Sequence, residues 1–327
     1  MNNQSMSTSV HGIHHVTAIA SNAQQNADFY VGLLGLRLVK KSVNQDVIDS
    51  YHLFYADEAG TPGTDLTFFI WPDMPPVRLG VGFTVEVSFA IPAGSLGYWQ
   101  DRLRQAGLEL GPLETRFGET TQPFEDPDGL RLALVEIQAE RKFHPWSGSP
   151  VPAQRQLRGM HAVRLLERDF KPTEVLLTQI MGFESLGAEA GWRRYGVEGG
   201  ASEGGASGQL VEIQELPGER RGQWGTGGIH HVAWRVKDTP EQMALRQAVI
   251  MAGLNPTAQI DRFWFKSVYF KEPGGTLFEL ATDGPGFDRD EDREHLGETL
   301  VLPPWLEAQR AQIEVGLPPL AVPVAAK

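Results

Sequence analysis

The chain has 327 residues, a formal net charge of −12 and no cysteine. The lack of cysteine excludes disulfides, thiolate metal ligands and cysteine nucleophiles, and the acidic balance argues against nucleic-acid binding, which needs a basic face. The N-terminal stretch MNNQSMSTSV has no apolar core, and no run of about 18 apolar residues follows it. We therefore expect no signal peptide, no membrane segment and a cytoplasmic location.

The first predicted unit spans residues 11–75 and opens with HGIHHVTAIA. Residues 13–19 have the pattern of a strand, and the run ADFYVGLLGL predicts a helix after a polar turn. Gly35 stands where a helix would end, and glycine is the residue best suited to a left-handed helix C-terminus.

Three further units repeat this order of strand, helix and strands. They span residues 83–138, 158–216 and 228–283, and the third and fourth open with GMHAV and GIHHV. In the third unit the helix-like run TEVLLTQIMG ends at Gly182. The second and fourth units end alike, since FEDPDGLRLALVE matches FKEPGGTLFELAT, and both predict a strand, a Pro/Gly turn and a strand.

Four βαβββ-like units predict an α+β protein in which curved mixed sheets surround clefts. At roughly 150 residues per domain the length suggests two domains, and the stretch HPWSGSPVP separates the halves. We expect an N-terminal domain over residues 1–148, a C-terminal domain over 149–290 and a tail over 291–327. The tail contains LPPWLEAQR, which predicts a short capping helix.

The histidine doublets suggest a metal site. Adjacent side chains of a strand point to opposite faces, so each doublet offers one histidine to a cleft. At the second position of the motif the first, third and fourth units have His15, Ala162 and His231. Only the first and fourth units therefore supply this histidine.

The unit endings supply a carboxylate. Alignment of the two Pro/Gly turns puts Ala133 of the second unit opposite Glu279 of the fourth, and the first unit ends LTFFIWP without a carboxylate. The third unit has Glu212 but no matching histidine. One complete set remains, namely His15, His231 and Glu279. Two histidines and one carboxylate form the facial triad of non-haem Fe(II) sites, and a shared ion requires units one and four to be neighbours.

Several fragments resemble one known family. GIHHVTAIA, YHLFYADEAGTPGT, GIHHVAW, the PGG turn before FEL and the tail LPPWLEAQRAQIEVGLPP are similar to the vicinal oxygen chelate superfamily, which includes glyoxalases, bleomycin-resistance proteins and extradiol dioxygenases. Within it they resemble the hydroquinone-type ring-cleaving dioxygenases, over about residues 11–318. The resemblance implies Fe(II) as the ion, with Mn, Zn or Ni as alternatives in a purified sample. It also implies a small aromatic diol and O2 as substrates.

The resemblance further implies four catalytic residues near the ion: Thr17, His230, Arg262 and Tyr269. Tyr269 or His230 would transfer protons, and Arg262 would hold a phenolic oxygen or developing negative charge. Thr17 lies two residues after His15 and shares its strand face. His14 is expected to form a hydrogen bond outside the cleft, and no role is predicted for His11, His52, His144, His161 and His295.

Two other functions remain open at this point. The first is a glyoxalase-like metal-dependent isomerase or lyase, a reaction that usually uses four protein ligands, whereas three are found here. The second is a metal-free protein that binds an aromatic compound, against which the complete triad argues. The sequence also leaves open whether copies of the chain form a homo-oligomer.

Overall fold

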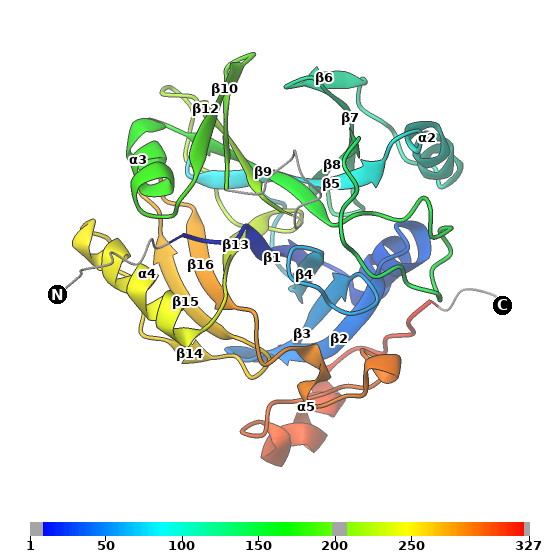
Figure 1. Cartoon of the computed structure of the whole chain (residues 1–327). Coiled ribbons are helices and arrows are strands. Elements are labelled where there is room, and N and C mark those ends of the chain that lie inside the picture. Colours follow the sequence, from blue (N-terminus) through cyan, green and yellow to red (C-terminus); the bar gives the residue numbers. More distant parts are fainter. Residues whose placement is uncertain (1–8, 198–207, 324–327) are drawn as a thin grey trace.

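The structure is a computed structural model that describes residues 9–197 and 208–323. Within these ranges sixteen strands form two eight-stranded sheets (Figure 1). The first sheet has the order β14-β15-β16-β13-β1-β4-β3-β2 and the second has the order β10-β11-β12-β9-β5-β8-β7-β6. The fold class expected from the sequence, α+β with mixed sheets, is confirmed.

The strands of the first sheet come from both ends of the chain: β1 (Ile13–Ala20), β2 (Arg37–Asn44), β3 (Val47–Ala56), β4 (Asp65–Ile70), β13 (Ile229–Val236), β14 (Ile260–Asp261), β15 (Lys266–Lys271) and β16 (Leu277–Thr282). The strands of the second sheet come from the middle: β5 (Phe83–Pro92), β6 (Glu114–Arg116), β7 (Glu119–Glu125), β8 (Arg131–Ile137), β9 (Met160–Glu167), β10 (Glu184–Glu189), β11 (Trp192–Gly196) and β12 (Leu210–Glu215).

Units one and four therefore share one sheet, and units two and three share the other. The sheets cut across the expected ranges 1–148 and 149–290, because each sheet takes one unit from each range. The connections explain how the chain crosses between the sheets. Segments 76–81 and 221–226 run side by side through the bridges Pro76–Thr226, Arg78–Gln223 and Val81–Arg221. The shared sheet does satisfy the requirement that units one and four be neighbours.

Each unit contributes one helical segment between its first and second strands. These are α1 (Ala23–Ala27) with the π-helix η1 (Asp28–Leu33), α2 (Leu96–Gln105), α3 (Lys171–Gln179) and α4 (Thr239–Met251). The helices lie along the outer sides of the two sheets (Figure 1). Gly35 and Gly182 follow two of them at φ 74° and 81°, which confirms the left-handed ends predicted from the sequence.

The C-terminal segment packs against the first sheet beside β2 and β3 (Figure 1). It contains the 3-10 turns η2 (Phe287–Arg289), η3 (Arg293–His295) and η4 (Glu307–Gln309) and the helix α5 (Arg310–Gly316). Buried Lys40 donates to Asp290 at 2.8 Å and to Glu291 at 2.5 Å, which anchors the segment. None of the described helices is long and apolar enough to cross a membrane.

The central strand pairs of both sheets contain β-bulges. In the β1–β13 pair His14 and His230 are skipped by the register, and in the β5–β9 pair Val85 and His161 are skipped. A bulge adds one residue to a strand and re-aims the neighbouring side chains. The first histidine of each GIHHV motif is thus the bulged residue, and the second one keeps its regular place in the ladder.

Candidate metal centre

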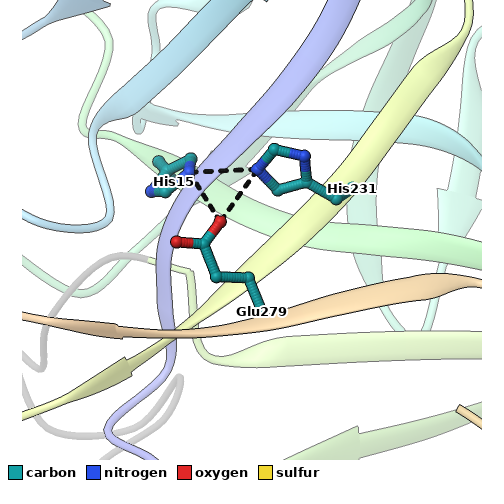
Figure 2. Close-up of side chains that lie close together, drawn as sticks. All are labelled: His15, His231 and Glu279. Carbon is teal, nitrogen blue, oxygen red and sulfur yellow. Dashed lines mark hydrogen bonds and ion pairs between the residues drawn. The ribbon is translucent and has the colours of Figure 1, made fainter. Parts of the chain in front are cut away.

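His15, His231 and Glu279 come from strands of the first sheet, and the ends of their side chains converge (Figure 2). Glu279 Oε2 lies 2.9 Å from His231 Nε2 and 3.4 Å from His15 Nε2, and the two Nε2 atoms are 3.3 Å apart. All three residues are at least 97% buried. The structure thus brings together the three residues that the sequence selected.

Strand register explains this convergence. Ala233 on β13 pairs with His15 on β1 at one side and with Glu279 on β16 at the other. His231 precedes Ala233 by two residues and therefore lies on the same face of β13. Because Ala233 has only a methyl group, it leaves space between the side chains of His15 and Glu279. The two imidazoles and the carboxylate can therefore meet above it.

The three donor atoms fit a bound divalent ion. For ligand bonds of about 2.0–2.2 Å, neighbouring donors around a six- or four-coordinate ion lie about 2.8–3.6 Å apart, and the three measured separations fall in this range. Neither carboxylate oxygen of Glu279 accepts an aligned hydrogen bond, although the side chain is fully buried. A cation is the partner that satisfies such a group.

Each ligand histidine is held by the histidine that precedes it. His14 Nδ1 and His15 Nδ1 are 2.9 Å apart, and His230 Nδ1 and His231 Nδ1 are 2.8 Å apart. Burial lowers the pKa of both His14 and His230 to about 3, and the adjacent His15 and His231, respectively, contribute to the shift. The two rings are therefore neutral and can accept a hydrogen bond. When His15 and His231 donate through Nδ1, their Nε2 lone pairs face the centre.

The electrostatics of the three residues keep Glu279 ionised. Burial alone would raise its pKa, but the adjacent His15 and His231 outweigh burial and hold the pKa well below its ordinary value. Burial lowers the pKa of His231, which favours the neutral imidazole that binds metals. Since an imidazole binds a metal through a deprotonated nitrogen, a metal-bound set of this kind would supply one negative charge and two neutral donors.

A cavity above the three residues is lined mainly by aromatic rings. The lining includes Phe54, Phe69, Trp264, Phe265 and Tyr269, together with the polar residues Asn44, Gln45, Asp46 and Arg262. The Asp46 side chain is 71% exposed and, with its partner Arg262, marks the rim. The free space is about 40 Å³, below the roughly 300–1,000 Å³ of typical ligand sites. A benzene ring enters this cavity only when part of the lining moves.

Tyr269 and Arg262 lie on the wall formed by β15 and the loop before it. Tyr269 pairs directly with Glu279 across the β15–β16 ladder, which agrees with the predicted hairpin around the PGG turn. Burial and the charge of Glu279 raise the pKa of Tyr269 above its ordinary value, so the phenol is neutral. The Arg262 guanidinium lies over the Tyr269 ring and donates to Asp46 Oδ2 at 2.9 Å.

Thr17 and His230 lie one step away from the cavity. The Thr17 hydroxyl is fully buried and is 2.8 Å from the Thr67 hydroxyl. His230 faces a separate hollow of about 210 Å³ beside Trp224, on which its ring stacks at 4.5 Å. Neither residue is therefore in direct contact with the three candidate ligands' meeting point. His230 is linked to it by its hydrogen bond to His231, and Thr17 by its place on β1 two residues after His15.

His52 is a lining residue to which the sequence analysis gave no role. It lies on β3 in the cavity wall, between the rings of Phe54 and Phe69. The fragment YHLFYADEAGTPGT contains it, but strand alternation alone does not indicate which face of β3 meets the cleft.

The second sheet shows what replaces a metal in the same framework. By register, Glu86 takes the place of His15, Ala162 that of His231, Glu212 that of Glu279, and Arg164 that of Ala233. Arg164 Nε donates to Glu212 at 2.6 Å and lies 3.8 Å from Glu86. A guanidinium thus occupies the centre of this sheet, and the hollow beside it, about 700 Å³, is lined by paired charges.

Comparison with known proteins agrees with this geometry. Residues 12–134 match the model of the Glyoxalase/Bleomycin resistance protein/Dioxygenase superfamily. A Bacillus subtilis (strain 168) protein named "Putative ring-cleaving dioxygenase MhqA" is 40% identical over 322 residues, which cover 95% of this chain and 99% of that protein. The chain belongs to the ring-cleaving dioxygenase branch of this superfamily.

Two more comparisons support the assignment. The chlorohydroquinone/hydroquinone 1,2-dioxygenase of Sphingobium indicum is 32% identical over 318 residues, or 93% of this chain and 95% of that protein. A crystal structure of a Bacillus subtilis (strain 168) protein described as a "putative dioxygenase" has a TM-score of 0.91 and 38% identity, and the match covers 97% of this chain and 99% of that chain. The family resemblance read from the motifs is confirmed.

Proposed function

We propose that the protein is an Fe(II)-dependent dioxygenase that cleaves the ring of hydroquinone-type or catechol-type aromatics with O2. The observation that supports this function best is a buried set of two histidines and one glutamate at the base of an aromatic-lined cavity. The relative named as a hydroquinone dioxygenase supports a diol substrate.

His15, His231 and Glu279 would hold the ion. Bound Fe(II) would supply open positions for a phenolic oxygen and for O2, and it would make the phenol easier to deprotonate. His14 and His230 keep the two ligand imidazoles in the tautomer that binds metal. The carboxylate of Glu279 balances one of the two positive charges.

The remaining side chains bind and orient the substrate. The rings of Phe54, Phe69 and Phe265 contact the faces of an aromatic ring and exclude water from the site. Tyr269, neutral and one strand away from Glu279, would donate a hydrogen bond to a substrate oxygen or transfer a proton to it. Arg262 adds a fixed positive charge at the rim.

The rim also determines how substrate enters. Arg262 on the loop before β15 bonds to Asp46 on the β2–β3 turn, and Gln45 donates to the Arg262 carbonyl at 2.9 Å. The Asp46 side chain is 71% exposed, so this pair lies at the outer end of the cavity. Separation of the pair would widen the cavity for a benzene ring.

The number of ligands favours oxygen chemistry over the isomerase. Glu279 pairs with Ala233 in the fourth unit, and the corresponding residue of the first unit is Thr67, which pairs with Thr17. A fourth carboxylate is thus replaced by a hydroxyl that already bonds to Thr17 and His52. A bound ion would then have no protein ligand on the side of Thr67, which would leave that side for substrate.

The test combines metal analysis with oxygen uptake. Protein purified without chelators and loaded anaerobically with Fe(II) is assayed in an oxygen electrode with hydroquinones and catechols. Oxygen uptake with ring-opened product supports the proposal. Zinc or nickel with no oxygen uptake indicates the isomerase, and protein that binds aromatics without binding any metal indicates the binding protein.

A further inference from the structure

We propose that His52 binds the substrate hydroxyl that does not bind the metal, and that it selects diols whose two hydroxyls lie across the ring from each other. This inference rests on the proposed function and assigns a specificity-determining residue within it.

The His52 ring is held in one orientation. Its centroid lies 3.9 Å from that of Phe54 and 4.5 Å from that of Phe69, so the ring is fixed between two aromatic neighbours. His52 Nε2 is 2.9 Å from the Thr67 hydroxyl. The other ring nitrogen, Nδ1, has no hydrogen-bond partner among the described residues. It is not fully buried either, so a ligand atom can approach it.

The position of His52 relative to the open side of the metal centre suits a second substrate oxygen. Thr67 stands where a fourth ligand would be, and His52 lies beside it on the next strand, β3. In the imidazole ring Nδ1 lies on the other side from Nε2, and therefore away from Thr67. Nδ1 can thus bond to the distal oxygen of an aromatic ring whose first oxygen is bound next to Thr67.

The hydrogen-bond chain behind His52 completes the site. Burial lowers the pKa of His52 well below its ordinary value, and the nearby His15 and His231 lower it further, so the imidazole is neutral. A neutral ring that accepts a substrate hydroxyl at Nδ1 carries its proton on Nε2. That proton is donated to Thr67, whose hydroxyl in turn is 2.8 Å from Thr17. His52, Thr67 and Thr17 then each have a hydrogen-bond partner.

The position of the two hydroxyls on the ring decides whether His52 is used. In a catechol both oxygens are adjacent and lie at the metal, on the Thr67 side of the His52 ring, so neither meets Nδ1. In a hydroquinone the second oxygen is at the far end of the ring, where His52 can bind it. Removal of the His52 hydrogen bond should therefore affect hydroquinone more than catechol.

The experiment compares hydroquinone with 4-methylphenol, in which a methyl group replaces the distal hydroxyl. Affinities of the Fe(II)-loaded protein are measured anaerobically by tryptophan fluorescence, since Trp264 lies in the cavity wall. The variants are His52→Leu, which removes the hydrogen bond, and His52→Asn, which retains a polar group. His295→Leu serves as the matched control, because that side chain is 64% exposed on the C-terminal segment.

We expect wild type to prefer hydroquinone over 4-methylphenol, and His52→Leu to reduce this preference by about five- to tenfold. His52→Asn should recover most of the preference, and His295→Leu should not change it. In oxygen uptake, His52→Leu should lower kcat/KM for hydroquinone by a larger factor than kcat/KM for catechol.

An unchanged preference in folded, iron-loaded His52→Leu, or no preference in wild type, overturns the role of His52 while oxygen uptake by wild type still supports the dioxygenase. Wild type without oxygen uptake on any diol overturns both. If His52→Leu does not fold, Thr67→Val replaces it, because loss of the Nε2 acceptor should reduce the same preference by about twofold or more, and an unchanged preference again overturns the role.

Discussion

Replacement of Glu279 by glutamine should remove iron from the protein without unfolding it. Glutamine keeps the volume of a fully buried side chain but removes the charge that balances the cation. At an effective dielectric constant of about 20, a carboxylate and a divalent ion at ligand distance attract each other by on the order of 10 kcal/mol, most of which is offset by dehydration of both. Mutation of a residue that only hydrogen-bonds to a metal ligand already lowers the affinity for the metal by about 10–100-fold.

We therefore expect Glu279→Gln to bind Fe(II) more than about 100-fold more weakly than wild type, by comparison with that range. Bound iron is measured by mass spectrometry after anaerobic loading and desalting, and circular dichroism in EDTA checks the fold. EDTA should lower the melting temperature of wild type, because it removes a ligand that stabilises the folded state, and it should leave that of Glu279→Gln nearly unchanged.

Glu212→Gln is the matched control, because Glu212 holds the same register position in the second sheet. Its carboxylate is bonded by Arg164 and Arg194, both at 2.6 Å, in place of histidines. Loss of a partner from this buried pair should lower the free energy of unfolding by about 3 kcal/mol, while iron content stays at the wild-type level. Full iron in Glu279→Gln, or equal iron loss in both variants, would refute the assignment of the centre to the first sheet.

Three further predictions concern Tyr269, His230 and the buried carboxyl group of Glu167, the last residue of β9. Tyr269→Phe should keep its iron and lose at least about tenfold in kcat for hydroquinone, with a smaller change in KM; unchanged oxygen-uptake kinetics would reduce Tyr269 to a packing residue. His230→Phe removes the Nδ1 partner of His231 and should weaken Fe(II) binding by about 10–100-fold, which a competition titration with a chelator measures; wild-type affinity would mean that His230 does not orient its neighbour. Burial, with Glu272, raises the pKa of Glu167 to about 9, so the folded chain keeps a proton that the unfolded chain loses above its ordinary pKa. The free energy of unfolding in EDTA should then fall as pH rises from 5 to 9, by at most about 1.4 kcal/mol per pH unit, and Glu167→Gln should flatten this slope in urea denaturation; an equal slope in both proteins would locate the titration elsewhere.

The second sheet explains why a repeated fold has one candidate metal centre among its described residues. At the register position of Ala233 it has Arg164, whose guanidinium lies between Glu86 and Glu212. A positive side chain at this point satisfies carboxylates that would otherwise need a cation. In the second sheet an arginine thus balances the buried carboxylates Glu86 and Glu212. In the first sheet the proposed cation would balance Glu279.

The sequence by itself determined the repeat, the strand doublets and the selection of the three converging residues. This was possible because the period of a strand and the absence of a ligand at Ala162 and Ala133 are local facts. The PGG hairpin was also readable, since a short turn dictates antiparallel pairing, and in the structure this hairpin places Tyr269 beside Glu279.

The sequence predicted that units one and four are neighbours, but only the tertiary structure showed that they pair edge to edge in one sheet. The reason is that β1 and β13, which form this edge, are more than 200 residues apart in the chain. It also decided that His14 and His230 are bulged residues that bond to the ligand histidines. Which face of β3 meets the cavity depends on the curvature of the whole sheet and on the rings packed against it. For that reason the sequence does not show that the His52 side chain points toward the site. The folded protein shows that His52 is one of the residues that line the cavity.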